Sequence, residues 1–183
     1  MFQSPKYVFK VVVVGEGGVG KTSLILRYTQ DRFLGEYITT IGTNFAVKTL
    51  NIDGQQIKLQ LWDLGGQAQF MRIRSFYYPG ARAAVVVYST ADRNTFEVVP
   101  KWAKEVRNIC GDIPLTLLGN KIDLDNERRV KKEEGLSQAS QISAEFFETS
   151  AKTGELINAA FTSIAKRIFG KMGKNTKLSG KPS

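Results

Sequence analysis

The sequence predicts an α/β fold with a doubly wound, mostly parallel six-stranded sheet and one antiparallel edge strand. Three observations support this prediction. Apolar, β-branched runs alternate along the 183 residues with stretches of helical spacing. A glycine-rich turn, residues 15–20, follows the first apolar run and precedes a helical pattern. Residues 45–50 and 57–62 alternate polar and apolar side chains on either side of a turn at 51–54, as in an antiparallel hairpin.

The remaining elements follow from hydrophobic periodicity in chain order. Strands are expected at residues 9–14, 45–50, 57–62, 83–88, 113–118 and 145–148, and helices at 21–30, 93–108, 132–144 and 155–169. Pro100 fits poorly inside the helix 93–108 and is expected to bend it. Residues 31–43 have no clean period and predict a long exposed loop, and residues 64–75 predict a mobile segment that leads into a short helix.

Length and charge predict one domain with a basic tail. Residues 1–170 form the expected domain, and residues 171–183 form a flexible basic C-terminal tail. The net charge is +9, and the chain from Lys166 onward has lysines and arginines but no acidic residue. Such a tail is usually a solvated, mobile end; direct attraction to an anionic membrane surface is the alternative, and nucleic acid binding is disfavoured relative to it.

Composition also limits the chemistry and the compartment. The chain has no histidine, which excludes any mechanism that needs an imidazole base. Cys110 is the only cysteine, so an internal disulfide is impossible and a reducing compartment is expected. No apolar run is long enough to cross a bilayer, and the first residues lack a signal-peptide pattern. We therefore expect a cytoplasmic protein that is at most peripheral at a membrane surface.

The glycine-rich turn predicts a phosphate-binding loop. It reads Gly15-Glu16-Gly17-Gly18-Val19-Gly20-Lys21-Thr22 and lies between a strand and a helix. Glycines let backbone N–H groups converge on an anion, and the start of the helix adds its positive end. The Lys21 ammonium can reach the β- and γ-phosphates, and the Thr22 hydroxyl can hold Mg²⁺. The alternative is a glycine turn that arose by chance.

A second candidate segment follows the strand 57–62. Asp63 precedes Leu64-Gly65-Gly66-Gln67. A carboxylate there can hold Mg²⁺ through its water shell, and the Gly66 N–H can approach a γ-phosphate closely. The alternative is a turn at the end of a strand with a solvated aspartate.

Residues 120–123, which read Asn-Lys-Ile-Asp, predict guanine recognition. The Asp123 carboxylate can accept hydrogen bonds from guanine N1–H and N2–H₂, whereas adenine would leave it unpaired. The Lys121 stem can lie over the base, and Asn120 can brace neighbouring loops. The alternative is an ordinary polar turn.

Two weaker signals complete the pattern. Thr149-Ser150-Ala151-Lys152 ends the last strand, where the Ala151 N–H can donate to guanine O6; the alternative is a helix N-cap region, with Thr153 as the cap. Thr40 lies in the long loop and can complete the Mg²⁺ shell when a γ-phosphate is present. Thr39 is a neighbour of the same type, and position alone does not choose between them.

Taken together, these motifs resemble the Ras-superfamily small GTPases, and among these the Rab branch, over residues 10–169. The resemblance implies a P-loop NTPase of the small G-domain type, with residues 1–170 binding GTP or GDP and Mg²⁺. It implies a GDP/GTP switch with a low intrinsic GTPase rate that regulates membrane traffic or signalling through effectors. It also implies that Thr40 is the switch I threonine, that Phe33 borders the guanine, that Tyr37 covers the phosphates and that Gln67 orients the attacking water.

The expected site residues fall into three groups. The catalytic group is Lys21, Thr40, Gly66 and Gln67, and the metal group is Thr22, Thr40 and Asp63. The nucleotide-binding group is Gly15, Glu16, Gly17, Gly18, Val19, Gly20, Lys21, Thr22, Ser23, Phe33, Tyr37, Thr40, Gly66, Asn120, Lys121, Asp123, Ser150, Ala151 and Lys152.

The same resemblance implies protein partners. Phe45, Trp62 and Tyr77 match the aromatic trio that Rab proteins present to effectors, so residues 40–45 with Trp62 and Tyr77 form the expected effector surface. The alternative for the trio is ordinary core packing. An exchange factor and a GTPase-activating protein are expected as further partners, and nucleic acid is not.

The sequence departs from the Rab pattern in three places. Gly65-Gly66-Gln67 resembles Arf proteins, and Ala68 replaces the usual glutamate, which puts recognition by Rab-type activators in doubt. Phe2 is not glycine, so Arf-like myristoylation is not expected. The last residues, 181–183, include no cysteine for prenylation. Either the chain is truncated, or the protein is not prenylated and binds membranes weakly or not at all.

Two other functions compete with a GTP-dependent switch. A P-loop nucleoside kinase would need an acceptor site and an arginine-rich lid, and the sequence shows no such lid. A nucleotide-locked scaffold without useful turnover is disfavoured by Gln67 and Thr40. The departures from the Rab pattern within residues 62–68 (switch II) keep this alternative open. Arg72 and Arg74 lie near switch II and are expected to be surface charges, so no arginine of the chain is assigned to transition-state stabilisation.

Overall fold

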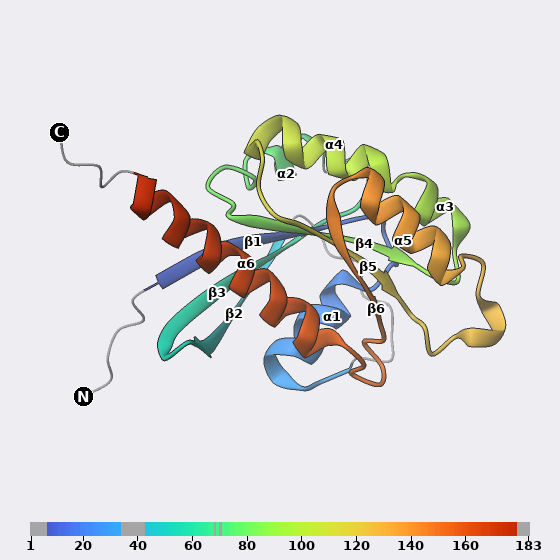
Figure 1. The fold of residues 1–183 in the computed structure, drawn as a ribbon. Coiled ribbons are helices and arrows are strands. Elements are labelled where there is room, and N and C mark those ends of the chain that lie inside the picture. Colours follow the sequence, from blue (N-terminus) through green and yellow to red (C-terminus); the bar gives the residue numbers. More distant parts are fainter. Residues whose placement is uncertain (1–6, 34–42, 68, 70, 179–183) are drawn as a thin grey trace.

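A six-stranded sheet between two layers of helices forms the centre of the molecule (Figure 1). The computed structural model describes residues 7–33, 43–67, 69 and 71–178. The strands are β1 (Tyr7–Val14), β2 (Thr43–Ile52), β3 (Gln55–Leu64), β4 (Ala83–Ser89), β5 (Leu115–Asn120) and β6 (Ala144–Thr149). Their order is β2-β3-β1-β4-β5-β6, with β2 antiparallel to β3 and every other neighbouring pair parallel. The predicted fold class, including the antiparallel edge strand, is therefore confirmed.

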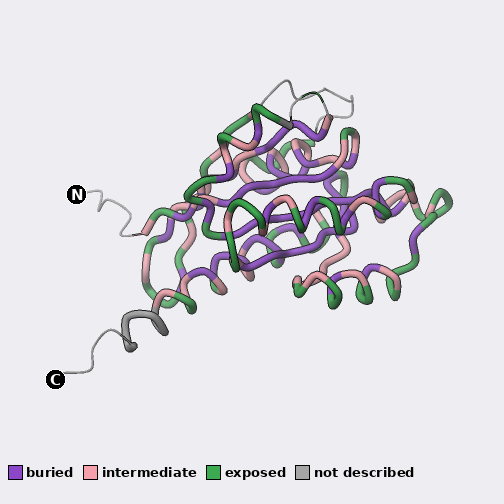
Figure 2. Tube along the Cα trace, turned by 90° about the horizontal axis from the view of Figure 1, so that it is seen from above, coloured by how far each residue is buried: buried purple, intermediate pink, exposed green. Residues whose placement is uncertain are grey.

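The helices lie on both faces of the sheet. They are α1 (Lys21–Gln30), α2 (Met71–Ser75), α3 (Arg93–Glu97), α4 (Val99–Cys110), the 3₁₀ turn η2 (Asp125–Glu127), α5 (Lys132–Gln141) and α6 (Ile157–Leu178). Helices α1 and α6 cover one face, and α3, α4 and α5 cover the other (Figure 1). Strands β4 and β5 are consequently buried at every position, whereas the edge strand β2 alternates between exposed and half-buried residues. Figure 2 shows the buried purple segments in the interior of the molecule.

The continuous apolar run of β1 serves two cores. Successive side chains of a strand point to opposite faces of the sheet. Val11 and Val13 pack with α1 and α6, whereas Val12 and Val14 pack with the α3–α5 layer. Because both faces are covered, every one of these positions is buried, and the strand needs no polar alternation.

The hairpin β2–β3 closes through a two-residue turn. Asp53 and Gly54 both have positive φ, 50° and 75°, as a type I′ turn requires. The predicted turn, residues 51–54, was too long, because Asn51 and Ile52 still pair with β3. The strands extend beyond the alternating segments because backbone pairing continues where the side-chain pattern ends.

Three predicted helices have different bounds in the structure. Helix α5 ends at Gln141 rather than at residue 144, where β6 already begins. The single helix expected at 93–108 is two helices, α3 and α4, joined at Val98. Pro100 lies at the start of α4, where its missing N–H costs nothing, so the proline marks a new helix rather than a bend. The last helix continues to Leu178, past the predicted end at residue 169, since the lysine-rich sequence there contains no proline.

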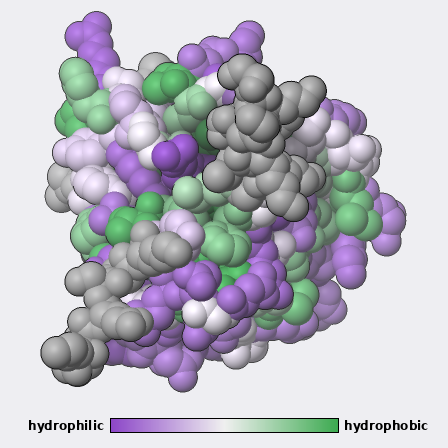
Figure 3. Space-filling view, turned by 60° about the vertical axis from the view of Figure 1, so that its left-hand side comes forward, coloured by the Kyte–Doolittle hydropathy of each residue, from purple (hydrophilic) through white to green (hydrophobic). Residues whose placement is uncertain are grey.

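The surface mixes apolar and hydrophilic side chains. On the face seen in Figure 3, green apolar patches are interspersed with purple hydrophilic residues. Within the described part of the chain, no helix combines the length and the apolar character that crossing a membrane requires.

The stacked rings of Tyr28 and Phe161 join α1 to α6, with centroids 4.5 Å apart and planes at 17°. We expect Phe161→Ala to lower the free energy of unfolding by about 3–5 kcal/mol, because it leaves a cavity in a closed core. Phe76, which is 81% exposed, provides the control: Phe76→Ala should change this energy by less than about 0.5 kcal/mol. Urea denaturation of both variants measures the difference, and equal losses would contradict the packing described here.

Candidate functional site

Four loops meet at the carboxyl edge of the parallel strands. They follow β1, β3, β5 and β6, at Gly15, Gly65, Lys121 and Ser150. Parallel strands place all their carboxyl ends at the same edge of a sheet, and ligands of doubly wound folds bind there. The topology therefore brings together the motifs that the sequence spreads over more than a hundred residues.

The phosphate loop (residues 15–22) is closed by its own lysine. The Lys21 Nζ donates to the carbonyl oxygens of Gly15 and Glu16, at 2.8 Å each. Burial lowers the pKa of Lys21 to about 8, although the nearby carboxylates of Asp63 and Glu16 favour its charged form. A buried ammonium needs an anion, and the loop therefore favours a phosphate beside it.

Asn120 joins the phosphate loop to the two loops beyond it. Its Nδ2 donates to the Val19 carbonyl at 2.9 Å, and its Oδ1 accepts from the Thr149 hydroxyl and the Ala151 N–H at 3.3 Å each. Gly20 has φ 96°, and a Cβ there would overlap the Asn120 amide, so this approach requires glycine. The bracing role predicted for Asn120 is confirmed.

The loops at 120–123 and 149–152 (the base loops) are also tied to each other. The Ser150 hydroxyl donates to the Asp123 carboxylate at 2.6 Å and accepts from the Thr153 N–H at 3.1 Å. Asp123 and Lys121 are half-buried, and Lys152 is exposed. The Thr153 hydroxyl accepts from the Glu155 N–H at 3.4 Å, but α6 begins only at Ile157, so Thr153 is not its N-cap.

Arg27 of α1 supports the second base loop, and the sequence analysis missed it. Its guanidinium donates to the carbonyl oxygens of Ala151 at 2.9 Å and Lys152 at 2.6 Å, and it pairs with Asp31. The contact spans more than a hundred residues of sequence. No local pattern around Arg27 indicates it, because the contact depends on how α1 crosses the sheet.

Two of the predicted metal-binding groups lie together beside the phosphate loop. The Thr22 hydroxyl is 2.5 Å from the Asp63 carboxylate, and Asp63 is buried. Mg²⁺ takes oxygen ligands and binds proteins through one or two carboxylates with phosphates and waters. A hydroxyl and a carboxylate in contact beside a phosphate loop fit that ion.

The segment after β3 lies directly against the phosphate loop. Gly66 is buried, and a Cβ on it would overlap the Gly15 carbonyl oxygen and lie 2.6 Å from the Gly17 amide nitrogen. Only glycine can approach so closely. Gln67 follows it, half-buried, with its side-chain oxygen accepting from Gln69 at 2.8 Å.

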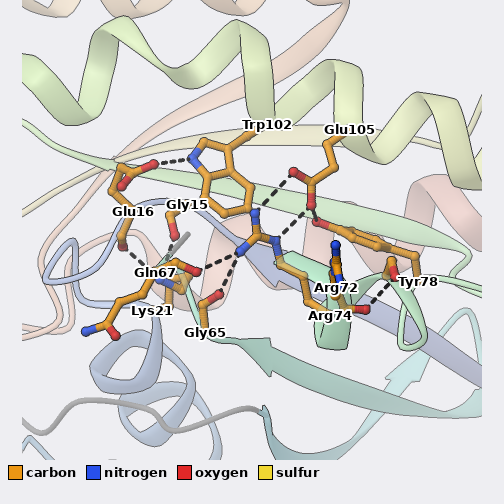
Figure 4. A network of polar contacts seen from close by, with 11 residues as sticks. Gly15, Glu16, Lys21, Gly65, Gln67, Arg72, Arg74, Tyr78, Trp102 and Glu105 are labelled. Atoms are coloured by element: carbon orange, nitrogen blue, oxygen red, sulfur yellow. Dashed lines mark hydrogen bonds and ion pairs between the residues drawn. The ribbon is translucent and has the colours of Figure 1, made fainter. Parts of the chain in front are cut away.

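Arg74 is buried, contrary to the sequence prediction, whereas Arg72 is exposed as predicted. Arg74 pairs with Glu105 of α4 and also donates to two carbonyl oxygens of the segment that contains Gly66 (Figure 4). Charge alone predicted a surface position, because an arginine is buried only where the fold supplies partners for it.

The remaining site residues divide into described and undescribed ones. Gly17, Gly18 and Ser23 lie in or directly after the phosphate loop, and Phe33 lies beyond α1 with its ring 40% exposed. Tyr37 and Thr40, with the alternative Thr39, lie outside the described residues, as does Ala68.

The aromatic trio forms one continuous row. The rings of Phe45 and Trp62 are 5.0 Å apart between centroids, and those of Trp62 and Tyr77 are 5.6 Å apart. Phe45 is 47% exposed, and the Lys10 ammonium lies 4.7 Å from the centroid of Trp62. Trp62 and Tyr77 are partly buried and pack against the core on the α3–α5 side, so core packing describes these two, whereas Phe45 is the exposed end of the row.

The profile of the Ras family matches residues 10–170 of this chain. The chain belongs to the Ras family. It is 40% identical over 174 residues to the Ras-related protein Rab-13 of Canis lupus familiaris, covering 94% of this chain and 86% of that protein. It is also 40% identical to Rab-13 of Bos taurus over 184 residues, covering 100% of this chain and 91% of that protein. It is 42% identical over 163 residues to the Ras-related protein Rab-21 of Homo sapiens. The aligned residues make up 88% of this chain and 72% of that protein.

Membership confirms the Rab-like assignment made from the motifs. This Ras-family protein is a small GTPase, a nucleotide-dependent switch in membrane traffic that binds guanine nucleotide and hydrolyses GTP. Effectors, exchange factors and activators are the partner classes of such a protein. The nucleoside kinase and the inactive scaffold are correspondingly the weaker interpretations.

The depressed pKa of Lys21 predicts that nucleotide affinity falls at alkaline pH. The empty protein loses the Lys21 proton above about pH 8, whereas bound phosphates hold that proton, so binding above this pH takes up a proton. We expect GDP affinity to fall about tenfold between about pH 7 and about pH 9. Titration with a fluorescent GDP measures it. The guanidinium of a Lys21→Arg variant does not titrate in this range, so its GDP affinity should lose this dependence on pH. An equal fall in affinity in the variant would contradict the assignment of the pH dependence to Lys21.

The Arg27 contacts predict an effect on nucleotide release. We expect Arg27→Met to increase the GDP dissociation rate about tenfold, because the loop at 149–152 loses two hydrogen bonds from a charged donor. Stopped-flow exchange against unlabelled nucleotide measures the rate. Asp31→Asn is the control: Asp31 is 92% exposed in its side chain, so this change should leave the rate within about twofold.

Proposed function

We propose that the four loops hold one guanine nucleotide, with its phosphates on residues 15–22 and its base against the loops at 120–123 and 149–152. The observation that carries this proposal is the Asn120 side chain, which hydrogen-bonds the phosphate loop and the last loop at once. The two halves of the site are thereby fixed at one separation, as a ligand with a base at one end and phosphates at the other requires.

Guanine selectivity is assigned to Asp123. Its carboxylate accepts from Ser150 through one oxygen, a contact that orients the group toward the base position. The Ala151 N–H, which donates to Asn120 at 3.3 Å, is the proposed donor to guanine O6. The Lys121 stem, held by a backbone with φ 69°, is proposed to lie over the base plane, and Phe33 to border it.

In the proposed hydrolysis, this chain's groups act mainly by position and charge. Lys21 offsets charge on the β–γ bridge and the γ-phosphate, and the loop amides and the Gly66 N–H donate to phosphate oxygens. Thr22, Asp63 and Thr40 are the proposed ligands of Mg²⁺, which neutralises phosphate charge when bound. Gln67 orients the attacking water. Arg74, the buried arginine next to this segment, donates to Glu105, and no arginine of this chain is assigned to the transition state, so the proposed intrinsic rate is slow and an activator raises it.

The proposed effector surface consists of residues 40–45 with Trp62 and Tyr77. The exposed ring of Phe45 and the contacts within the trio support it.

We also propose the division into a nucleotide-binding domain at 1–170 and a basic tail at 171–183. A lysine-rich tail without acidic residues attracts anionic lipid, so the proposed location is the cytoplasm, with peripheral contact at a membrane.

Asp123→Asn tests the proposed function. Asparagine presents a donor where guanine N2–H₂ also donates, so GDP affinity should fall by at least about a hundredfold while xanthosine diphosphate gains affinity. Competition binding with GDP and xanthosine diphosphate measures the two changes in affinity. Asp125→Asn, two residues away and 86% exposed in its side chain, is the control and should bind GDP as the original protein does. Unchanged GDP affinity in Asp123→Asn would reject the proposed base site.

A further inference from the structure

Arg74 is a buried cation near the site and is even less exposed than Lys21, whose relative exposure is 6%. The relative exposure of Arg74 is 2%, and its guanidinium makes four hydrogen bonds. Two go to the Glu105 carboxylate, from Nε at 2.8 Å and Nη2 at 3.2 Å. The guanidinium also lies 4.4 Å from the centroid of the Trp102 ring.

The other two hydrogen bonds hold the main chain on either side of Gly66. Nη1 of Arg74 donates to the carbonyl oxygens of Gly65 at 3.3 Å and Gln67 at 3.2 Å (Figure 4). Only a guanidinium can pair with a carboxylate on one edge and reach two carbonyls with the other, since an ammonium is a point donor. These contacts fix the backbone from which the Gln67 side chain projects.

The two residues that contact the Arg74 guanidinium, Glu105 and Trp102, have further hydrogen-bond partners. Tyr78 donates its hydroxyl to the same Glu105 oxygen at 2.8 Å, and both Glu105 and Trp102 lie on α4. Trp102 Nε1–H donates to the Glu16 carboxylate at 3.2 Å. One face of α4 therefore holds both the phosphate loop, through Glu16, and the segment with Gln67, through Arg74.

We propose that Arg74 is a positioning residue for GTP hydrolysis, acting through Gln67. By fixing the Gln67 main chain against α4, it limits the places that the Gln67 side chain can reach. Its guanidinium is turned toward Glu105, so it does not stabilise charge on the phosphates directly. This inference rests on the role proposed above for Gln67.

The test compares single-turnover GTP hydrolysis in Arg74→Lys and Arg72→Lys. Lysine at 74 keeps the charge but cannot hold Glu105 and both carbonyls, and we expect hydrolysis about tenfold slower. Arg72 lies on the same short helix and is exposed, so Arg72→Lys should hydrolyse GTP at the original rate. An unchanged rate in Arg74→Lys would overturn the proposal.

A double-mutant cycle with Gln67→Leu separates positioning from general destabilisation. If Arg74 acts through Gln67, adding Arg74→Lys to Gln67→Leu slows hydrolysis by less than about twofold. The same tenfold loss in both backgrounds would overturn the proposal. Gln67→Leu hydrolysing at the original rate would instead show that the proposed role of Gln67 fails, a distinct result.

Folding is monitored by the thermal midpoint of the GDP complex. If Arg74→Lys does not fold, Glu105→Gln replaces it in the double-mutant cycle with Gln67→Leu. The glutamine keeps an acceptor for Tyr78 but places an NH₂ group against the Arg74 guanidinium. It should also slow hydrolysis, and again only when Gln67 is present. Equal slowing with leucine at position 67 would count against the proposal.

Discussion

The structure of the site depends on the buried amide of Asn120. This one side chain donates to the phosphate loop and accepts from the loop that follows β6, so two motifs far apart in sequence share a partner. An amide suits this task because it offers donors and an acceptor on opposite branches. These three hydrogen bonds tie the loop after β1 to the end of β6 and the loop beyond it.

The two buried cations near the loops, Lys21 and Arg74, have different partners. Lys21 is enclosed by carbonyl oxygens, and its pKa is pulled down by burial despite nearby carboxylates. Arg74 has its full countercharge in Glu105. The physical cost of burying a cation is thus met in two ways: by carbonyl oxygens and nearby carboxylates around Lys21, and by the Glu105 carboxylate of α4 at Arg74.

The sequence could predict the parts of the site that depend on local geometry. A glycine-rich turn between a strand and a helix is a short-range pattern, and its lysine and threonine follow directly at the start of the helix. The Asp63 segment and the loops at 120 and 150 each follow an apolar strand, so their place at the carboxyl edge follows from the fold class. By contrast, Pro100 indicated an irregularity, but not that a second helix begins there, because a proline suits both a kink and a first turn.

The sequence by itself determined the fold class, the antiparallel edge strand, the strands that the motif-bearing loops follow, and the family, because these depend on periodicity and on short motifs. Only the tertiary structure decided that Arg74 is buried, that Arg27 supports the loop after β6, and that Phe45, Trp62 and Tyr77 form one row. Whether an arginine lies in solvent or in the interior depends on a carboxylate or carbonyl that another element supplies. Glu105 is 31 residues from Arg74, and Ala151 is 124 residues from Arg27, so the pairing exists only after the chain has folded.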